Sequence, residues 1–303
     1  MWERSGAWHC GPMDAAALIR TSLPDALGEP VAALAPLSGG DTSSAWRVEL
    51  GSGRTLFVKT HADPPPGFFT TEAAGLRWLG EPGAVPVPAV LAVSDDPPLL
   101  ALEWVGPSGR ARRTSAGEAA FGRGLTALHG AGAAAFGRED RRTTGSLALP
   151  NEPARDWPSF YAERRLLPLA RIAAERGTLG AGDVRRCESV AARLGGIGAA
   201  DEPPARLHGD LWAGNRLVDD AGTSWLIDPA AHGGHREFDL AMMRLFGGFD
   251  AECFAAYEEA SPLAPGWRER VPLHQLAPLL VHAIKFGGGY VGATRDVLRR
   301  FAG

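Results

Sequence analysis

The sequence has few cysteines and no long apolar stretch. Its three cysteines, among 303 residues, lie far apart and do not form the close pairs that bind zinc or build a disulfide framework. No apolar run reaches the ~18 residues needed to cross a bilayer, and residues 1–12 lack the apolar segment of a signal peptide. We therefore expect no cysteine-bound zinc, no membrane partner and a reducing, cytoplasmic location.

The sequence also lacks an excess of basic residues. Its 31 Lys and Arg are outnumbered by 35 Asp and Glu, which gives a formal net charge of −4. Because proteins that bind nucleic acids neutralise phosphates with Lys and Arg, we do not expect a nucleic-acid partner. A Walker-A motif is absent as well, which excludes the P-loop mode of phosphate binding.

The secondary-structure signals change from strands to helices along the chain. Residues 45–50 and 55–59 flank a glycine-containing turn and predict a β-hairpin, and residues 99–105 predict a buried strand. Helices are expected at 71–79, 115–130, 156–177, 183–194 and 237–246. Ser115 and Glu118 have the spacing of a capping box at the start of one of them. The pattern predicts an α+β fold with a sheet-rich first part and a mainly helical second part.

The most informative segment is HGDLWAGN, residues 208–215. Asp210 and Asn215 have the spacing of the kinase catalytic loop, and Asp228 ends an apolar strand expected at 225–228. In that loop the first Asp orients and deprotonates a hydroxyl, and the other two residues hold a metal. Because oxygen ligands of these types suit Mg²⁺, we predict Asp210 as the base and Asn215 and Asp228 as the metal ligands. His208 is expected to bond the loop backbone.

A second set of candidates lies in the sheet-rich part. Lys59 ends an expected strand and Glu72 lies in the next helix, which is the pairing that positions the α- and β-phosphates of ATP in kinases. The nearby glycine-rich segment can present backbone N–H groups and hydroxyls to phosphate, although a simple surface turn is the alternative. Its candidate residues are Gly39, Gly40, Thr42 and Ser43.

These sites predict two lobes around a nucleotide cleft. Residues 13–106 are expected to form a small antiparallel-sheet N-lobe that binds nucleotide, and residues 107–303 a larger helical C-lobe for catalysis and substrate binding. Residues 1–12 are expected to be a disordered leader, with Met13 as an alternative start.

The motifs together resemble the fructosamine kinase (ketosamine-3-kinase) family. The likeness is carried by residues 208–215, by IDPA at 227–230 and by GHREFDLAMMRLFGGF at 234–249, and it extends from about residue 37 almost to the C-terminus. The resemblance implies a protein-kinase-like bilobal fold related to aminoglycoside phosphotransferases. It also implies ATP-dependent phosphorylation of the 3-hydroxyl of a ketosamine, either a ribulosamine or a fructosamine. The product decays and releases the free amine, which amounts to deglycation.

The same resemblance assigns further roles. Trp212 is expected to face the substrate, and the backbone groups of Glu103 and Val105 to receive adenine. His235 and Glu237 either contact substrate or cap the helix that follows them.

Two further features complete the comparison with the family. Asp239 is expected to brace the catalytic loop from below. Many relatives carry a cysteine in the glycine-rich loop that supports a redox-linked dimer. This chain has Gly40-Asp41-Thr42 there, so no such switch is expected.

Two alternatives stay open at this point. The first is another small-molecule kinase of the same fold, acting on an aminoglycoside, choline or homoserine; the basic segment 295–301 counts against an aminoglycoside. The second is a non-catalytic, nucleotide-binding regulatory protein, against which the complete set of catalytic residues counts. The sequence leaves open which ketosamine is used, whether it is free or protein-linked, and the oligomeric state.

Overall fold

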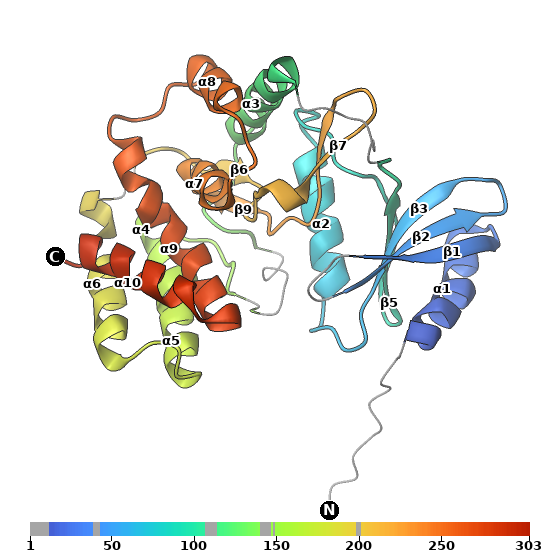
Figure 1. Ribbon diagram of the computed structural model, residues 1–303, viewed down its shortest axis with the longest axis horizontal. Helices are drawn as coiled ribbons and strands as arrows, with labels where there is room; N and C mark the ends of the chain where they lie inside the picture. Colours follow the sequence, from blue (N-terminus) through green and yellow to red (C-terminus); the bar gives the residue numbers. More distant parts are fainter. Residues whose placement is uncertain (1–11, 39–42, 107–113, 140–146, 148, 198–200) are drawn as a thin grey trace, which may run out of the picture.

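The computed structural model describes residues 12–38, 43–106, 114–139, 147, 149–197 and 201–303. Figure 1 shows a β-sheet with two flanking helices beside a larger group of helices. The first part contains α1 (Pro12–Leu27), β1 (Val31–Leu37), β2 (Ser44–Leu50), β3 (Thr55–Thr60), α2 (Phe68–Gly80), β4 (Val90–Asp95) and β5 (Pro98–Glu103). The second part begins with α3 (Ser115–Gly130), α4 (Trp157–Tyr161), the π-helical turn η1 (Ala162–Leu166), α5 (Leu167–Glu175) and α6 (Ala181–Ile197). It continues with β6 (Ala205–Leu207), the 3₁₀ turn η2 (Ala213–Asn215), β7 (Arg216–Val218), β8 (Ser224–Leu226), β9 (His232–Gly234), α7 (Glu237–Phe246), α8 (Ala251–Ala260), α9 (Trp267–Phe286) and α10 (Gly289–Phe301).

The strands of the first part form an antiparallel sheet in the order β1-β2-β3-β5-β4. Side chains alternate between the two faces of a strand. Leu56 and Val58 of β3 therefore pack with α1, whereas Phe57 and Lys59 face α2. This alternation directs the predicted phosphate-binding lysine toward the helix that carries Glu72.

The two parts of the molecule meet along α2, which lies on the side of the sheet nearer the helices (Figure 1). Gly75 of α2 packs closely against the segment that follows β8: a Cβ at this position would lie 3.3 Å from Pro229 and 3.4 Å from Ala231. In the helical part, Trp157 and Tyr161 of α4 are fully buried and stack on each other with centroids 4.8 Å apart. The segment that follows Asp228 is therefore packed against α2 of the sheet-rich part.

Several expected elements are confirmed. β2 and β3 form the predicted hairpin, and α2, α3, α6 and α7 occupy the expected positions with boundaries shifted by a few residues. The helix expected at 156–177 begins as predicted, because the carboxylate of Asp156 accepts a hydrogen bond from Ser159 N at 2.8 Å. It is then interrupted by the π-helical turn η1.

Other features differ from the sequence analysis. No element was expected at α1, although Ala15, Ile19 and Leu23 recur at helical spacing and pack on the sheet. The predicted capping box is wrong: Thr114 caps α3, and Glu118 pairs instead with Arg216 at 2.7 Å.

Two expectations fall largely outside the described residues. The predicted leader, residues 1–12, lies outside them except for Pro12, where α1 begins. The start of the predicted C-lobe, residues 107–113, lies outside them as well. None of the helices in the described ranges is long and apolar enough to cross a membrane.

Candidate active site

The catalytic loop follows β6 and contains a glycine that the backbone requires. Gly209 has a φ of 81°, and a Cβ at this position would lie 2.1 Å from the carbonyl oxygen of Ala230. A residue with a side chain would therefore have to push two backbone segments apart. This close approach places Asp210 directly beside the segment that carries Asp228.

Asp239 of α7 fixes the loop from below, as predicted. Its two carboxylate oxygens accept hydrogen bonds from the backbone N–H groups of His208 at 2.7 Å and Gly209 at 2.9 Å. His129 of α3 contacts the same carboxylate at 3.3 Å. Burial by itself would raise the pKa of Asp239, but the bond with His129 and the loop amides outweigh it, so the pKa lies below its usual value. A buried, ionised Asp239 thus holds the loop backbone in one position.

His208 is part of the same support. Its Nε2–H donates to Ile227 O at 2.9 Å, and its Nδ1 accepts from Asp210 N at 3.2 Å. The side chain is fully buried, and burial lowers its pKa, so His208 is neutral with both ring nitrogens occupied. This arrangement supports the structural role that we expected for it.

The predicted base, Asp210, lies inside a cavity. Asn215 Nδ2 donates to both the backbone oxygen and Oδ2 of Asp210, at 2.9 and 3.0 Å. Burial raises the pKa of Asp210 to about 7, although the bond from Asn215 opposes this shift. A carboxylate with a pKa near neutrality is well suited to accept a proton from a hydroxyl.

Lys59 joins the sheet to the loop after β8. Its Nζ lies 2.8 Å from Glu72 Oε1 and 2.5 Å from Asp228 Oδ1. Burial alone would lower the pKa of Lys59, but the two carboxylates outweigh burial and raise it, so the ammonium stays charged. Asp228 has a φ of 54°, the only positive φ of a non-glycine residue in the described chain. Strained backbone of this kind persists where the surroundings fix it, often at functional sites.

Two side chains beside the base offer oxygen atoms to a metal ion. Asn215 uses its amide nitrogen for both bonds to Asp210, which leaves Oδ1 available. Asp228 uses Oδ1 for Lys59, and its side chain is 41% exposed. Amide and carboxylate oxygens are the donors that Mg²⁺ takes in proteins, together with water. The donor set therefore fits the predicted magnesium ligands.

All of these groups border one cavity of about 750 Å³. The predicted residues that line it are Ser43, Lys59, Glu72, Asp210, Trp212, Asn215 and Asp228. Trp212 is 40% exposed and meets Phe246 of α7 edge-to-face, with centroids 6.2 Å apart. The structure thus brings residues from both parts of the chain to one site.

The other residues that were predicted to bind the nucleotide do not line the cavity or lie outside the described residues. Gly39, Gly40 and Thr42 lie outside the described residues. Glu103 and Val105 lie at and just after the end of β5, but they do not line this cavity. The backbone N–H of Glu103 donates to Ala89 O at 2.9 Å, which leaves it unavailable to adenine in this conformation.

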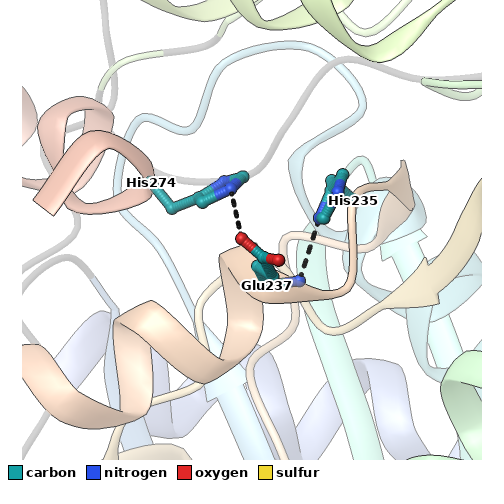
Figure 2. A group of neighbouring side chains, drawn as sticks. All are labelled: His235, Glu237 and His274. Carbon is teal, nitrogen blue, oxygen red and sulfur yellow. Dashed lines mark hydrogen bonds and ion pairs between the residues drawn. The ribbon is translucent and has the colours of Figure 1, made fainter. Parts of the chain in front are cut away.

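The structure does not bring His235 and Glu237 to the cavity, because neither residue is part of its lining. Both are buried, and Figure 2 shows the His274 ring pointing at the Glu237 carboxylate, 3.3 Å away. Arg270 donates to both oxygens of that carboxylate at 2.9 and 2.5 Å. His235, Glu237 and His274 have potential metal-ligand atoms within 4.8 Å of one another. The Arg270 guanidinium, however, already bonds both carboxylate oxygens of Glu237, and its positive charge opposes the binding of a metal ion there. The structure therefore places His235 and Glu237 in a buried cluster at the start of α7, and not in the cavity where substrate contact was expected.

The sequence analysis assigned no role to several other residues that line the cavity. They are Arg165, His232, His282, Lys285, Phe286 and Tyr290. One signal was available: Arg165 lies four residues after Tyr161, on the apolar face of an expected helix, where a charge is unusual. The others depend on how α9, α10 and β9 are placed in three dimensions.

Comparison with known proteins gives the chain its family. A model of the fructosamine kinase family matches residues 16–302. The chain belongs to the fructosamine kinase family. A "probable ketoamine kinase" of Lactiplantibacillus plantarum is 35% identical over 272 residues, covering 88% of this chain and 93% of that protein. A crystal structure of a "putative fructosamine-3-kinase" from Thermobifida fusca is 44% identical with a TM-score of 0.86, covering 93% of this chain and 97% of that one.

Fructosamine kinases are phosphotransferases with an alcohol group as acceptor. A more distant structure, of a thermostable mutant of aminoglycoside phosphotransferase APH(4)-Ia, is 17% identical with a TM-score of 0.63, covering 94% of this chain and 99% of that one. This second likeness shows the protein-kinase-like fold. The predicted fold class and the predicted family are both confirmed.

Proposed function

We propose that the chain is an ATP- and Mg²⁺-dependent kinase that phosphorylates the 3-hydroxyl of a ketosamine. The observation that carries this proposal is the meeting of Asp210 and Asn215 with Lys59, Glu72 and Asp228 around one cavity, in a member of the fructosamine kinase family. Three acidic groups, an amide and a lysine at these positions form the set that phosphoryl transfer requires.

The reaction proceeds by transfer of the γ-phosphoryl group to the sugar. Asp210 accepts the proton of the 3-hydroxyl while that oxygen forms a bond to the γ-phosphorus, and the bond to the β-phosphate oxygen breaks to release ADP. Lys59, held by Glu72, places its charge on the phosphates. The ketosamine 3-phosphate then decomposes and frees the amine.

Asn215 and Asp228 would hold the magnesium ion through their oxygen atoms. When bound, Mg²⁺ neutralises charge that builds up on the phosphates during transfer. Asp210 remains bonded to Asn215 Nδ2 in the structure, so the base and the metal site are oriented by one side chain.

A buried cation in the cavity lining favours a neutral sugar over a polycation. Arg165 lines the cavity and bonds to neutral oxygens, Pro150 O at 2.7 Å and Asn151 Oδ1 at 2.8 Å. Because the buried Arg165 cation repels ammonium groups, we expect the cavity to bind an aminoglycoside weakly. An intact Lys59–Glu72 pair and base also favour turnover over the regulatory alternative, binding without catalysis.

The test is ADP release from MgATP with fructoselysine, ribuloselysine, kanamycin and choline side by side, using Asp210→Asn as the blank. We expect turnover with the ketosamines and a loss of roughly 10²–10⁴-fold in the variant, because general base catalysis contributes about this much. Turnover with kanamycin or choline alone would identify a different kinase of the same fold. Silence together with tight ADP binding would favour the regulatory role.

Four further features stay predictions. They are the lobe boundaries at 13–106 and 107–303, the adenine contacts of the backbone groups of Glu103 and Val105, the phosphate contacts of the glycine-rich loop, and a cytoplasmic location.

A further inference from the structure

His232 of β9 presents an unused hydrogen-bond acceptor next to the catalytic loop. Its Nδ1–H donates to Ala230 O at 2.9 Å, which leaves Nε2 as the ring nitrogen with a lone pair. Nε2 is buried and has no hydrogen-bond partner in the described part of the chain, although the residue lines the cavity. Such a buried polar atom is costly unless a ligand or water satisfies it. Burial and the nearby Arg165 lower the pKa of His232 to about 3, so the ring is neutral.

The surroundings of His232 fix this acceptor in place. The ring stacks on Phe160 with centroids 5.3 Å apart and meets Phe238 edge-to-face at 5.8 Å. On its other side, a Cβ at Gly209 would lie 2.9 Å from His232 Nδ1. His232 is therefore packed against the residue that precedes Asp210, and His232 and Asp210 line the same cavity.

Arg165 of η1 supplies the complementary donor. It is 4% exposed, lies over the Phe160 ring at 4.6 Å, and lines the same cavity. Its hydrogen bonds go to Pro150 O, Arg164 O and Asn151 Oδ1, and no carboxylate in the described ranges pairs with it. Burial lowers its pKa to about 9, which still leaves it charged at neutral pH. Glu152 is near enough to oppose this shift but forms no ion pair with Arg165. A buried guanidinium that no carboxylate bonds retains the capacity to donate to a ligand.

The pair selects the chemistry of its ligand. A ligand group must give a hydrogen to His232 Nε2 and accept one from Arg165. An ammonium group cannot accept and is repelled by Arg165, and a carboxylate has no hydrogen to give. A hydroxyl does both, and neighbouring hydroxyls on a sugar chain can serve the two residues at once.

We propose that Arg165 and His232 form a subsite for the sugar hydroxyls beyond C4, so that the ketosamine enters sugar first. This inference rests on the proposed function and adds the orientation of the substrate. The amine then points toward the rim, where Trp212 is 40% and Phe286 54% exposed. Because the amine faces solvent, its size is weakly restricted, and a lysine side chain on a protein fits as well as a free amino acid.

The test compares ketosamines of one amine, glycine, that carry sugars of four, five and six carbons. His232→Asn retains a donor for Ala230 O but removes Nε2, and Arg165→Lys retains the charge but loses the planar fork. We expect each variant to lower kcat/KM for the five- and six-carbon substrates about 10- to 100-fold, mainly through KM, because unpaired buried polar groups discriminate on this scale. The four-carbon substrate, which lacks the outer hydroxyls, changes less than about threefold.

Matched controls are His61→Asn and Arg171→Lys, which lie outside the cavity and leave all three substrates unaffected. Equal losses on all three sugars, or a change in the KM for ATP alone, would overturn the subsite. If the wild type ignores every ketosamine, the proposed function itself fails, and this is visible without any variant.

A second measurement needs only the wild-type enzyme. Ketosamines made from 5-deoxy and 6-deoxy sugars each lack one outer hydroxyl. We expect at least one of them to lose about tenfold or more in kcat/KM, because the group that it leaves unpaired is buried. Equal rates for both deoxy substrates and the parent sugar would contradict the subsite even if the variants fail to fold.

Discussion

The Nζ of Lys59 lies 2.5 Å from Oδ1 of Asp228, a residue 169 positions further along the chain. This ion pair connects β3 of the sheet with the segment after β8, and Glu72 of α2 forms a second ion pair with the same Lys59 Nζ. The charge that is expected to meet the phosphates is therefore held at the boundary between the two parts of the molecule. Removing it affects both stability and catalysis, and the two effects can be separated.

Lys59→Met should lower kcat/KM for ATP by about 10²–10³-fold, because it removes a preorganised charge at the phosphates. It should also lower the free energy of unfolding by about 3–5 kcal/mol, since Glu72 is left buried without its partner. The double variant Lys59→Met/Glu72→Gln should regain stability in urea unfolding but no activity. A double variant that turns over ATP like the wild type would exclude Lys59 as the phosphate anchor.

Asp239→Asn should disturb the catalytic loop without touching substrate. The amide keeps one acceptor but turns a donor toward a backbone N–H, so either His208 or Gly209 loses its bond. We expect a loss of about 1–3 kcal/mol in unfolding free energy, together with a fall in kcat larger than any change in KM. Asp296→Asn, at an exposed position on α10, is the matched control. Unchanged stability and kcat would show that Asp239 does not brace the loop.

Glu237 makes stability depend on acid pH. Burial by itself would raise its pKa, but His274 and Arg270 outweigh burial and lower the pKa from 4.5 to about 2. A carboxyl with a depressed folded-state pKa stabilises the fold above the unfolded value near 4.5, and this contribution is lost as the pH falls toward 2.

Glu237→Gln should therefore be less stable than the wild type at pH 7, by roughly 2–3 kcal/mol. The difference should shrink steadily below pH 4.5, as measured by urea unfolding across that range. Glu259→Gln, on the exposed side of α8, should show no such trend. A difference that stays constant from pH 7 to pH 3 would contradict the ion-pair cluster.

Trp212→Ala should weaken ketosamine binding. The indole is 40% exposed and lines the cavity that contains the proposed base, Asp210, so the proposed substrate would lie against it. We expect the KM for the ketosamine to rise about tenfold, on the scale of a lost aromatic contact, with the KM for ATP unchanged and Trp212→Phe intermediate. Steady-state kinetics with each substrate varied in turn decides this. A change confined to ATP would place Trp212 on the nucleotide side.

The catalytic core could be predicted from the sequence because its residues lie in short linear motifs. Asp210 and Asn215 share one loop, and the alternation of β3 directs Lys59 toward α2. The glycine of the loop motif also has a physical basis, because only a residue without a side chain at position 209 permits the close contact with Ala230 O. These features depend on local spacing, which the sequence displays directly.

The rest of the site depends on long-range packing. Glu118 satisfies the local rule for a capping box, but its stronger partner is Arg216, 98 residues away. Glu237 follows shortly after Asp228, the predicted metal ligand, in the sequence. In the structure, however, Arg270 and His274 of α9 contact its carboxylate, and Glu237 is buried. Arg165 of η1 lines the cavity together with His232 of β9, and Phe160 of α4 stacks on His232. No periodicity in the sequence records these placements.

The most direct test of the account is the stoichiometry and position of phosphorylation. With MgATP and fructoselysine, the phosphate should appear on O3 by NMR, and one free amine should follow for each ADP formed. Asp210→Asn should yield neither product. Phosphate on another hydroxyl, or ADP formation without release of the amine, would contradict the proposed function.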